Sequence, residues 1–227
     1  HGVPHFIFSS SCSVYGNIAS LPVSEDTPLG SAESPYAYTK QIGERIVADH
    51  VRIDPRMKAI SLRYFNPAGA HSSGLNGEDP KNAPSSLVPV ITLTASGRLP
   101  KMYVHGTDYP TRDGSCIRDY VHVSDIADAH IAALYRTHGA DMAERHEIIN
   151  LGTGEGVSVL EAIAAFEEVS GVKVNCQMGP RRAGDVGAIW SDTNRSQKSL
   201  GWQPQRDLRE MMRSAWVWEQ RCKAARS

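Results

Sequence analysis

Short apolar runs that end in polar residues recur along this sequence and restrict its fold more than any other feature. His5-Phe6-Ile7-Phe8 is followed at once by three serines, Ser9 to Ser11. The run 59–63 repeats the pattern and ends in Tyr64-Phe65-Asn66-Pro67. Short buried runs bounded by polar residues are typical of parallel strands that are covered on both faces. Because helix-like segments separate these runs, the sequence predicts an α/β fold.

A helix with a tyrosine and a lysine on one face is predicted after the first strand. Ser34 can cap this helix with its hydroxyl, and Pro35 suits the first helical position. Residues four apart share a helix face, so the phenol of Tyr36 should lie beside the ammonium of Lys40. A nearby positive charge favours the phenolate that a general base needs. This spacing is common on ordinary surface helices, but the neighbouring strand ends favour a catalytic pair, since open α/β sheets bind ligands there.

Local signals predict the later elements. The Tyr36 helix should extend to about His50, with an apolar side formed by Ile42, Ile46 and Val47. The expected later helices are 87–97, one that follows 119–123 and is capped by Ser124, one capped by Ser158 and ended by Gly171, and 208–222. The expected later strands are 101–105, 147–150 and 172–177. The Ser124 helix should bury Ile126, Ala127, His130, Ile131 and Leu134. The Gly-, Ser-, Asn- and Pro-rich stretch 68–86 is interpreted as a substrate loop.

Composition indicates a small-molecule partner. The 227 residues are 41% hydrophobic, enough for a sizeable core. A net charge of -1 without long single-sign runs predicts neither nucleic-acid nor membrane-surface binding, and no apolar run is long enough to span a bilayer. Histidine and cysteine spacings match no metal motif, and the four cysteines form no C-x-x-C pair. We therefore predict no metal, free thiols in a reducing compartment, and a cytoplasmic location.

Several motifs, in order, resemble the UDP-galactose 4-epimerase family of the extended short-chain dehydrogenase/reductase superfamily. They are Ser9 to Gly16, Ser34 to Lys40, Arg63 to His71, Gly77 to Pro80, Gly106 to Thr111, Arg118 to Val123, Asn150 to Gly152 and Arg181 to Asp185. The resemblance covers nearly the whole chain. It implies the carboxyl-terminal part of a Rossmann-like parallel sheet with a smaller α/β substrate-binding lobe. Residues 1–86 would be the remaining part of the NAD-binding domain, with later strands interleaved, and 87–227 mainly the UDP-sugar lobe.

The resemblance implies reversible epimerisation at C4 of UDP-galactose and UDP-glucose, in galactose metabolism. Enzyme-bound NAD would take a hydride from C4 and return it to the opposite face of a transient 4-keto sugar. Tyr36 would remove the proton of the 4-hydroxyl, and Ser11 would be its hydrogen-bond partner or relay. Lys40 would hold the nicotinamide ribose, and Phe65 would lie along the nicotinamide. The implied cofactor-binding residues are Ser9, Ser11, Tyr36, Lys40, Tyr64 and Phe65.

The same resemblance implies a site for the nucleotide. Arg118 and Arg182 match the diphosphate positions, where a guanidinium can bind phosphate oxygens in pairs. Asp185 matches the carboxylate on the uridine ribose, and Asn66 the amide at the phosphate. Leu87 matches the uridine site, while Tyr103 and His105 belong to the strand beside uracil. The implied substrate-binding residues are Ser11, Tyr36, Asn66, Ser86, Leu87, Tyr103, His105, Arg118, Arg182, Asp185 and Ile189.

Three positions depart from the family pattern. Ser85-Ser86 replaces an Asn-Asn pair, so shorter hydroxyls would contact uridine diphosphate more weakly or through water. His105 must stack without the aromatic neighbour that many members have. Ile189 stands where members restricted to glucose and galactose have a tyrosine. The smaller side chain leaves room for a 2-acetamido group, so UDP-N-acetylhexosamines are possible substrates.

Competing functions within this superfamily are separated by single motifs. Dehydratases and decarboxylases share the Tyr/Lys pair but carry an acid just before Val-Tyr-Gly, where this chain has Cys12-Ser13. Uronate epimerases usually lack the run from Asn66 to His71. The sequence contains no G-x-G-x-x-G turn for the NAD pyrophosphate, and so resembles the last two-thirds of a family member. The alternative is an inactive fragment that only binds nucleotide sugar. A full-length member would be expected to form a homodimer, in which the Tyr36 helix could take part.

Overall fold

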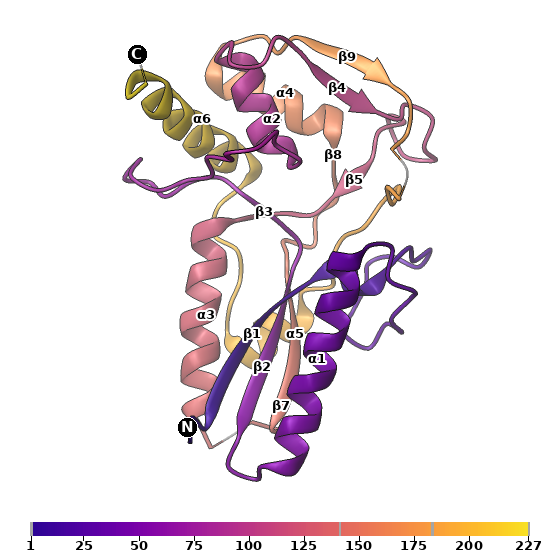
Figure 1. Cartoon of the computed structure of the whole chain (residues 1–227), viewed down its shortest axis with the longest axis vertical. Helices are drawn as coiled ribbons and strands as arrows, with labels where there is room; N and C mark the ends of the chain where they lie inside the picture. The colour runs from indigo at the N-terminus through magenta and orange to yellow at the C-terminus, as the bar shows by residue number, and fades with distance from the viewer. Residues whose placement is uncertain (1, 141, 183, 227) are drawn as a thin grey trace. The chain divides into compact units, whose positions relative to one another are not determined.

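The computed structural model describes residues 2–140, 142–182 and 184–226, so Ala183 of the Arg181–Asp185 motif lies outside the described residues. The chain divides into two units, each assembled from three separate stretches. Unit 1 comprises His1–Phe65, Asp125–Glu155 and Ile189–Gln203, and unit 2 comprises Asn66–Ser124, Gly156–Ala188 and Pro204–Ser227. Both units combine helices with short strands, which confirms the predicted α/β class (Figure 1). The functional division at 86/87 stays a prediction.

Unit 1 is built on a parallel sheet of three strands in the order β1-β2-β7. The strands are β1 (His5–Ser11), β2 (Lys58–Tyr64) and β7 (His146–Leu151). The first two are the apolar runs identified in the sequence, each extended to include the polar residues that follow. Because the strands are parallel and in register, Ser11, Tyr64 and Leu151 lie level at one edge of the sheet. The predicted convergence of strand ends is therefore present in unit 1.

Two long helices flank this sheet, α1 (Pro35–Ile53) and α3 (Val123–His138) (Figure 1). Successive side chains of a strand point to opposite faces of the sheet. Arg63 bonds to Glu44 of α1, and the next residue, Tyr64, bonds to His130 of α3. The two helices therefore cover opposite faces. The shorter elements of unit 1 are η1 (Cys12–Tyr15) and α5 (Asn194–Leu200), which the sequence did not predict.

The predicted apolar side of α1 is wrong for two of three residues. Val47 is buried, but Ile42 and Ile46 are 40% and 62% exposed. The helix instead turns Ala37 and the charged Glu44 towards the sheet. Hydrophobic periodicity cannot identify a buried face that contains a carboxylate, because burial of a charge depends on a partner elsewhere in the chain. The helix also ends at Ile53, about one turn beyond the predicted His50.

The predicted start and buried face of α3 are also wrong. The helix begins at Val123, so Ser124 lies inside it, and the backbone N–H of Ser124 donates to Nδ1 of His122 at 3.0 Å. Of the five residues expected on the buried face, Ile126 alone is buried; the others are exposed or half-buried. The small residues Ala129 and Ala133 occupy the inner face. Small side chains allow a helix to approach a sheet closely, which leaves the larger ones outside.

Among its described residues, unit 2 contains three strand pairs and three helices. The pairs are β3 (Asn66–Ala68) with β6 (Tyr120–His122), β4 (Met102–His105) with β9 (Cys176–Gly179), and β5 (Ile117–Arg118) with β8 (Val157–Ser158). The first two pairs are parallel and the third is antiparallel. The helices are α2 (Leu87–Ala95), α4 (Val159–Ser170) and α6 (Leu208–Ala224). Their apolar faces enclose a core that includes Ile91, Phe166, Met211 and Met212.

The predicted ends of α4 are confirmed in unit 2, whereas the predicted last strand is displaced. The predicted capping box of α4 is present, because Ser158 Oγ accepts from the N–H of Glu161 and the Glu161 carboxylate accepts from the N–H of Ser158. Gly171 ends this helix in the left-handed conformation, as expected. The predicted strand 172–177 is wrong in its bounds, since β9 spans Cys176–Gly179. The short strands β3, β5 and β8 were not predicted, and residues 69–86 form no helix or strand.

Candidate active site

The start of α1 brings Tyr36 and Lys40 to the end of β1. Ser34 Oγ accepts from the N–H of Ala37 at 3.1 Å, which caps the helix as predicted. Nζ of Lys40 donates to the backbone O of Ser9 at 2.7 Å and lies 5.4 Å from the centre of the Tyr36 ring. Tyr36 is 56% exposed, so its phenol is open to a ligand. The geometry is that of a phenol beside a fixed positive charge at a strand end.

The next strand end carries a second tyrosine with a different environment. The hydroxyl of Tyr64 lies 2.7 Å from Ser9 Oγ and 2.7 Å from Nε2 of His130. Nδ1 of His130 lies 2.8 Å from the backbone O of Ile126. A carbonyl only accepts, so Nδ1 of His130 carries a hydrogen, and the Tyr64 hydroxyl donates its single hydrogen to Ser9 Oγ. Burial raises the pKa of Tyr64, with a smaller contribution from Tyr36, so Tyr64 remains a neutral phenol.

Ser11 is buried at the end of β1. Its Oγ accepts from the backbone N–H of Ser13 at 3.2 Å and from the Ser13 hydroxyl at 3.0 Å, so it caps η1. Both bonds use Ser11 as an acceptor, which leaves its own O–H free to donate. In the part of the chain that the structure describes, no hydrogen bond joins Ser11 to Tyr36. Its role as a relay stays a prediction.

Phe65 and Ile189 pack together in unit 1. Both are buried in one cluster with Val14, Tyr15 and Val23. The backbone N–H of Phe65 donates to Leu151 O at 3.0 Å, which fixes Phe65 just beyond the strand ends. The packing places Phe65 near the candidate cofactor residues. Ile189 belongs to unit 1, whereas the residues predicted to bind the nucleotide from Asn66 to Asp185 belong to unit 2.

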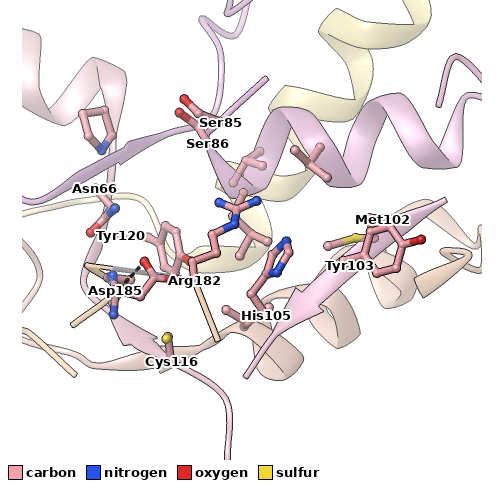
Figure 2. A pocket seen from close by; sticks show the side chains of 16 residues that line it. Asn66, Ser85, Ser86, Met102, Tyr103, His105, Cys116, Tyr120, Arg182 and Asp185 are labelled. Atoms are coloured by element: carbon pink, nitrogen blue, oxygen red, sulfur yellow. Dashed lines mark ion pairs between the residues drawn. The ribbon is translucent and has the colours of Figure 1, made fainter. Parts of the chain in front are cut away.

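Unit 2 contains a pocket with a cavity volume of about 310 Å³. Every nucleotide residue predicted in unit 2 lines it: Asn66, Ser86, Leu87, Tyr103, His105, Arg118, Arg182 and Asp185. Several of these side chains converge on the cavity in Figure 2. Cys116 also lines the pocket, and no motif in the sequence indicates this residue. The volume lies at the lower end of the usual range for small-ligand sites, about 300–1,000 Å³.

The charges in this pocket suit an anion. Two arginines line it, and Nη2 of Arg118 lies 3.6 Å from Asp185 Oδ1, which neutralises only one of them. Asn66 has a buried Oδ1 without a hydrogen-bond partner among the described residues. Tyr103 and His105 lie two apart on β4, so their rings stand on the same face of the strand, with ring centres 6.1 Å apart and a tilt of 38° between them. Net positive charge, an unpaired amide and two rings match a nucleoside diphosphate.

The described residues contain neither a membrane-crossing helix nor a metal site. No helix in residues 2–140, 142–182 and 184–226 combines the length and apolar character needed to cross a bilayer. Across the same ranges, no group of three or more His, Cys, Asp or Glu side chains could hold a metal ion. All four cysteines are free thiols.

A parallel sheet whose strand ends meet a Tyr-x-x-x-Lys pair on a flanking helix defines an extended short-chain dehydrogenase/reductase fold. The sequence profile described as GDP-mannose 4,6 dehydratase matches residues 3–215, and the chain belongs to that family. Within it, the similarity is to UDP-glucose 4-epimerases, which confirms the resemblance found in the sequence. The UDP-glucose 4-epimerase of Neisseria meningitidis serogroup A is 48% identical over 217 residues, covering 96% of this chain and 63% of that protein.

Two solved structures show the same fold. The UDP-glucose 4-epimerase of Stenotrophomonas maltophila, with bound NAD and formylated UDP-arabinopyranose, has a TM-score of 0.94 at 43% identity, covering 99% of this chain and 66% of that one. The enzyme from Bifidobacterium longum, in complex with NAD+ and UDP, has a TM-score of 0.91 at 42% identity, covering 97% and 65%. The chain therefore spans slightly less than two-thirds of the length of its relatives.

Proposed function

We propose that the protein is an NAD-dependent 4-epimerase of UDP-hexoses that interconverts UDP-galactose and UDP-glucose in galactose metabolism. The observation that carries this proposal is the Tyr36–Lys40 pair, fixed to the end of β1 by the bond from Lys40 to Ser9 O. The similarity to UDP-glucose 4-epimerases and the pocket of unit 2, which two arginines line, support it. Free thiols are consistent with a reducing, cytoplasmic location, which we propose as well.

The residues of unit 1 fit the nicotinamide end of NAD. An ammonium has three N–H donors, and Lys40 uses one of them on Ser9 O, which leaves two for ribose hydroxyls. Phe65 offers an apolar surface beside the strand ends. When bound, NAD supplies a hydride acceptor for C4 of the sugar. Tyr36 removes the proton of the 4-hydroxyl, and Lys40 stabilises the phenolate that does so.

The nucleotide residues serve a different requirement. A sugar oxidised at C4 must turn over before it is reduced from the other face, so the nucleotide has to be held firmly and the sugar loosely. Arg118 and Arg182 provide charge-assisted bonds for a diphosphate, and Asp185 provides an acceptor for ribose hydroxyls. Ser85 and Ser86 supply only short hydroxyls, which favours contacts through water.

The proposal is tested by following UDP-galactose with the protein and added NAD, and by identifying the product chromatographically. Epimerisation gives UDP-glucose with the 6-hydroxyl intact. A 4-keto-6-deoxy sugar would instead show a dehydratase. We expect UDP-glucose, because Cys12 and Ser13 stand where a dehydratase has the acid that elimination requires.

A second candidate is that this 227-residue chain only binds nucleotide sugars. The absence of a G-x-G-x-x-G sequence for the NAD pyrophosphate favours it. Titration calorimetry separates the two candidates. Binding of UDP without turnover in the presence of NAD would support the binding fragment, whereas turnover would exclude it.

Ile189 supports a broader substrate range. It is buried in the apolar cluster with Phe65, where a tyrosine would occupy more volume. We propose that UDP-N-acetylhexosamines are also converted. The test compares UDP-GlcNAc with UDP-glucose for the parent and for Ile189→Tyr. The variant should lose the N-acetylated substrate selectively, and a parent that leaves UDP-GlcNAc unconverted would contradict the proposal.

Exposed apolar side chains on α1 support a homodimer. Tyr38, Ile42 and Ile46 follow each other at intervals of four, and Ile53 continues the exposed apolar surface at the end of the helix. We propose that two copies pair through this face. Light scattering after gel filtration should give a dimer for the parent and a monomer for Ile46→Glu. A parent that is a monomer at high concentration would contradict it.

A further inference from the structure

Three fully buried polar side chains lie side by side across the sheet of unit 1. In the strand register, Ser10 of β1 is beside Arg63 of β2, and Arg63 is beside Asn150 of β7. The next residues along β1 and β2 are Ser11 and Tyr64, both candidate site residues. A polar row therefore crosses the sheet one residue before the strand ends.

Glu44 of α1 bonds to two members of this row. Its Oε1 accepts from Ser10 Oγ at 2.6 Å and from Arg63 Nε at 2.9 Å, and its Oε2 accepts from Arg63 Nη2 at 2.7 Å. The Arg63 and Glu44 side chains are only 2% and 6% exposed. Glu44 follows Lys40 by four residues and Tyr36 by eight, so the three share one face of α1.

The row is also held from the β7 side. The guanidinium of Arg63 lies 4.8 Å from the centre of the Tyr15 ring. The Tyr15 hydroxyl donates to Asn150 Oδ1 at 2.6 Å, and the backbone N–H of Asn150 donates to Glu25 Oε1 at 2.7 Å. Burial raises the pKa of Tyr15 to about 12, so its hydroxyl remains a donor. Side-chain contacts at the level of Ser10, Arg63 and Asn150 thus connect the three strands with α1 and η1.

Stability alone does not account for a buried ion pair at this place. Well-packed apolar residues of similar volume are often as stabilising or more so, because the pair loses its hydration. The apolar cluster of Val47, Val51, Met57 and Ala59 already packs α1 against β2. Apolar contacts tolerate small shifts of a helix along a strand, whereas a paired guanidinium and carboxylate fix its position.

We propose that Glu44 is a positioning residue, which acts through Ser10 and Arg63 to fix Lys40 and Tyr36 against the strand ends. The inference rests on the proposed 4-epimerase function. Lys40 bonds to the backbone O of Ser9, the residue just before Ser10, so these two hydrogen-bonded contacts of α1 with β1 are adjacent. Losing the Glu44 contacts would let the first half of α1 shift relative to β1.

The test compares Glu44→Gln with a matched control. Glutamine keeps the volume of Glu44 but not its charge. The control is Glu147→Gln, because Glu147 forms a two-bond ion pair with Arg136 in the same unit, at 2.8 and 2.7 Å, and both side chains are nearly buried. For Glu44→Gln, we expect kcat to fall about 10-fold to 100-fold, the cost of a displacement of about 1 Å. KM for UDP-galactose should stay unchanged, since unit 2 holds the nucleotide residues.

A second readout does not depend on turnover. Hydrogen exchange of the backbone N–H groups in 9–11 and 36–40 should speed up in Glu44→Gln and not in Glu147→Gln. Ser10→Ala removes one bond and leaves the ion pair, so it should fold and show a smaller fall in kcat. If Glu44→Gln does not fold, Ser10→Ala provides the test. An unchanged kcat together with unchanged hydrogen exchange of the backbone N–H groups in 9–11 of Ser10→Ala would overturn the inference.

The outcomes also separate this inference from the proposed function. A parent protein without turnover would contradict the epimerase assignment, and the exchange measurement would still test the positioning role. An active parent with a folded Glu44→Gln variant of equal kcat would overturn the positioning role alone. An equal fall in kcat for Glu147→Gln would overturn it too, because the effect would then follow from general destabilisation.

Discussion

Replacing Lys40 with methionine removes one positive charge beside Tyr36 and keeps most of the side chain's length. Nζ of Lys40 lies 5.4 Å from the centre of the Tyr36 ring. Two unit charges at that distance interact by about 0.8 kcal/mol in bulk water and by about 3 kcal/mol at an effective dielectric constant of about 20. Because Tyr36 is 56% exposed, the stabilisation of its phenolate should fall between these limits. At about 1.4 kcal/mol for each tenfold change in rate, kcat should fall about 4-fold to 140-fold.

The assay follows formation of UDP-glucose from UDP-galactose at saturating NAD. Saturation is needed because Lys40 is also proposed to hold the nicotinamide ribose, so that weaker cofactor binding would otherwise be mistaken for slower chemistry. Lys40→Arg is the control, since it keeps the charge but changes the geometry of its donors. We expect the methionine variant to lose more activity than the arginine variant. A methionine variant with the parent's kcat would refute the electrostatic reasoning.

Three further predictions concern the pocket, the acid stability and a helix cap. Arg182→Ala should weaken UDP binding about 10-fold to 100-fold in calorimetry, the loss of a charge-assisted bond of about 1.5–3 kcal/mol. Burial lowers the pKa of His146 below 6.5, so the stability this group contributes is complete above pH 6.5 and is lost as the pH falls towards the lower folded pKa. Urea unfolding at about pH 7.5 and about pH 5.5 should therefore show a smaller acid loss of unfolding free energy for His146→Gln than for the parent, and an equal loss would exclude this cause. Ser158→Ala should lower the free energy of unfolding by about 1 kcal/mol, because the N–H of Glu161 loses its acceptor.

Features that depend on a few neighbouring residues could be predicted from the sequence. Ser34 caps α1, and Ser158 with Gly171 bounds α4, because each signal requires only residues within one helix turn. The spacing of Tyr36 and Lys40 fixed their common face for the same reason. Much of the lining of the pocket in unit 2 could also be predicted, because the family resemblance implies eight of its lining residues; that it binds a nucleotide stays a prediction.

Features that depend on partners distant in the chain could not be predicted in the same way. No local signal indicated that Glu44 is buried, since its partner Arg63 lies on a strand 19 residues further on. Ile131 was expected on the buried face of α3 because it falls on the apolar side of the helical period. Ala129 is buried instead, because its small side chain allows α3 to approach the sheet closely. His130 became part of the site through its bond to Tyr64, which no helical periodicity could indicate.

The most direct test of the account is the rate of UDP-galactose conversion by Tyr36→Phe. Phenylalanine keeps the ring beside Lys40 and removes only the hydroxyl that is proposed to take the proton. We predict a fall in kcat of about 100-fold to 10,000-fold, the usual contribution of a general base, with UDP affinity unchanged in calorimetry. A variant that converts the sugar at the parent's rate would contradict the central claim.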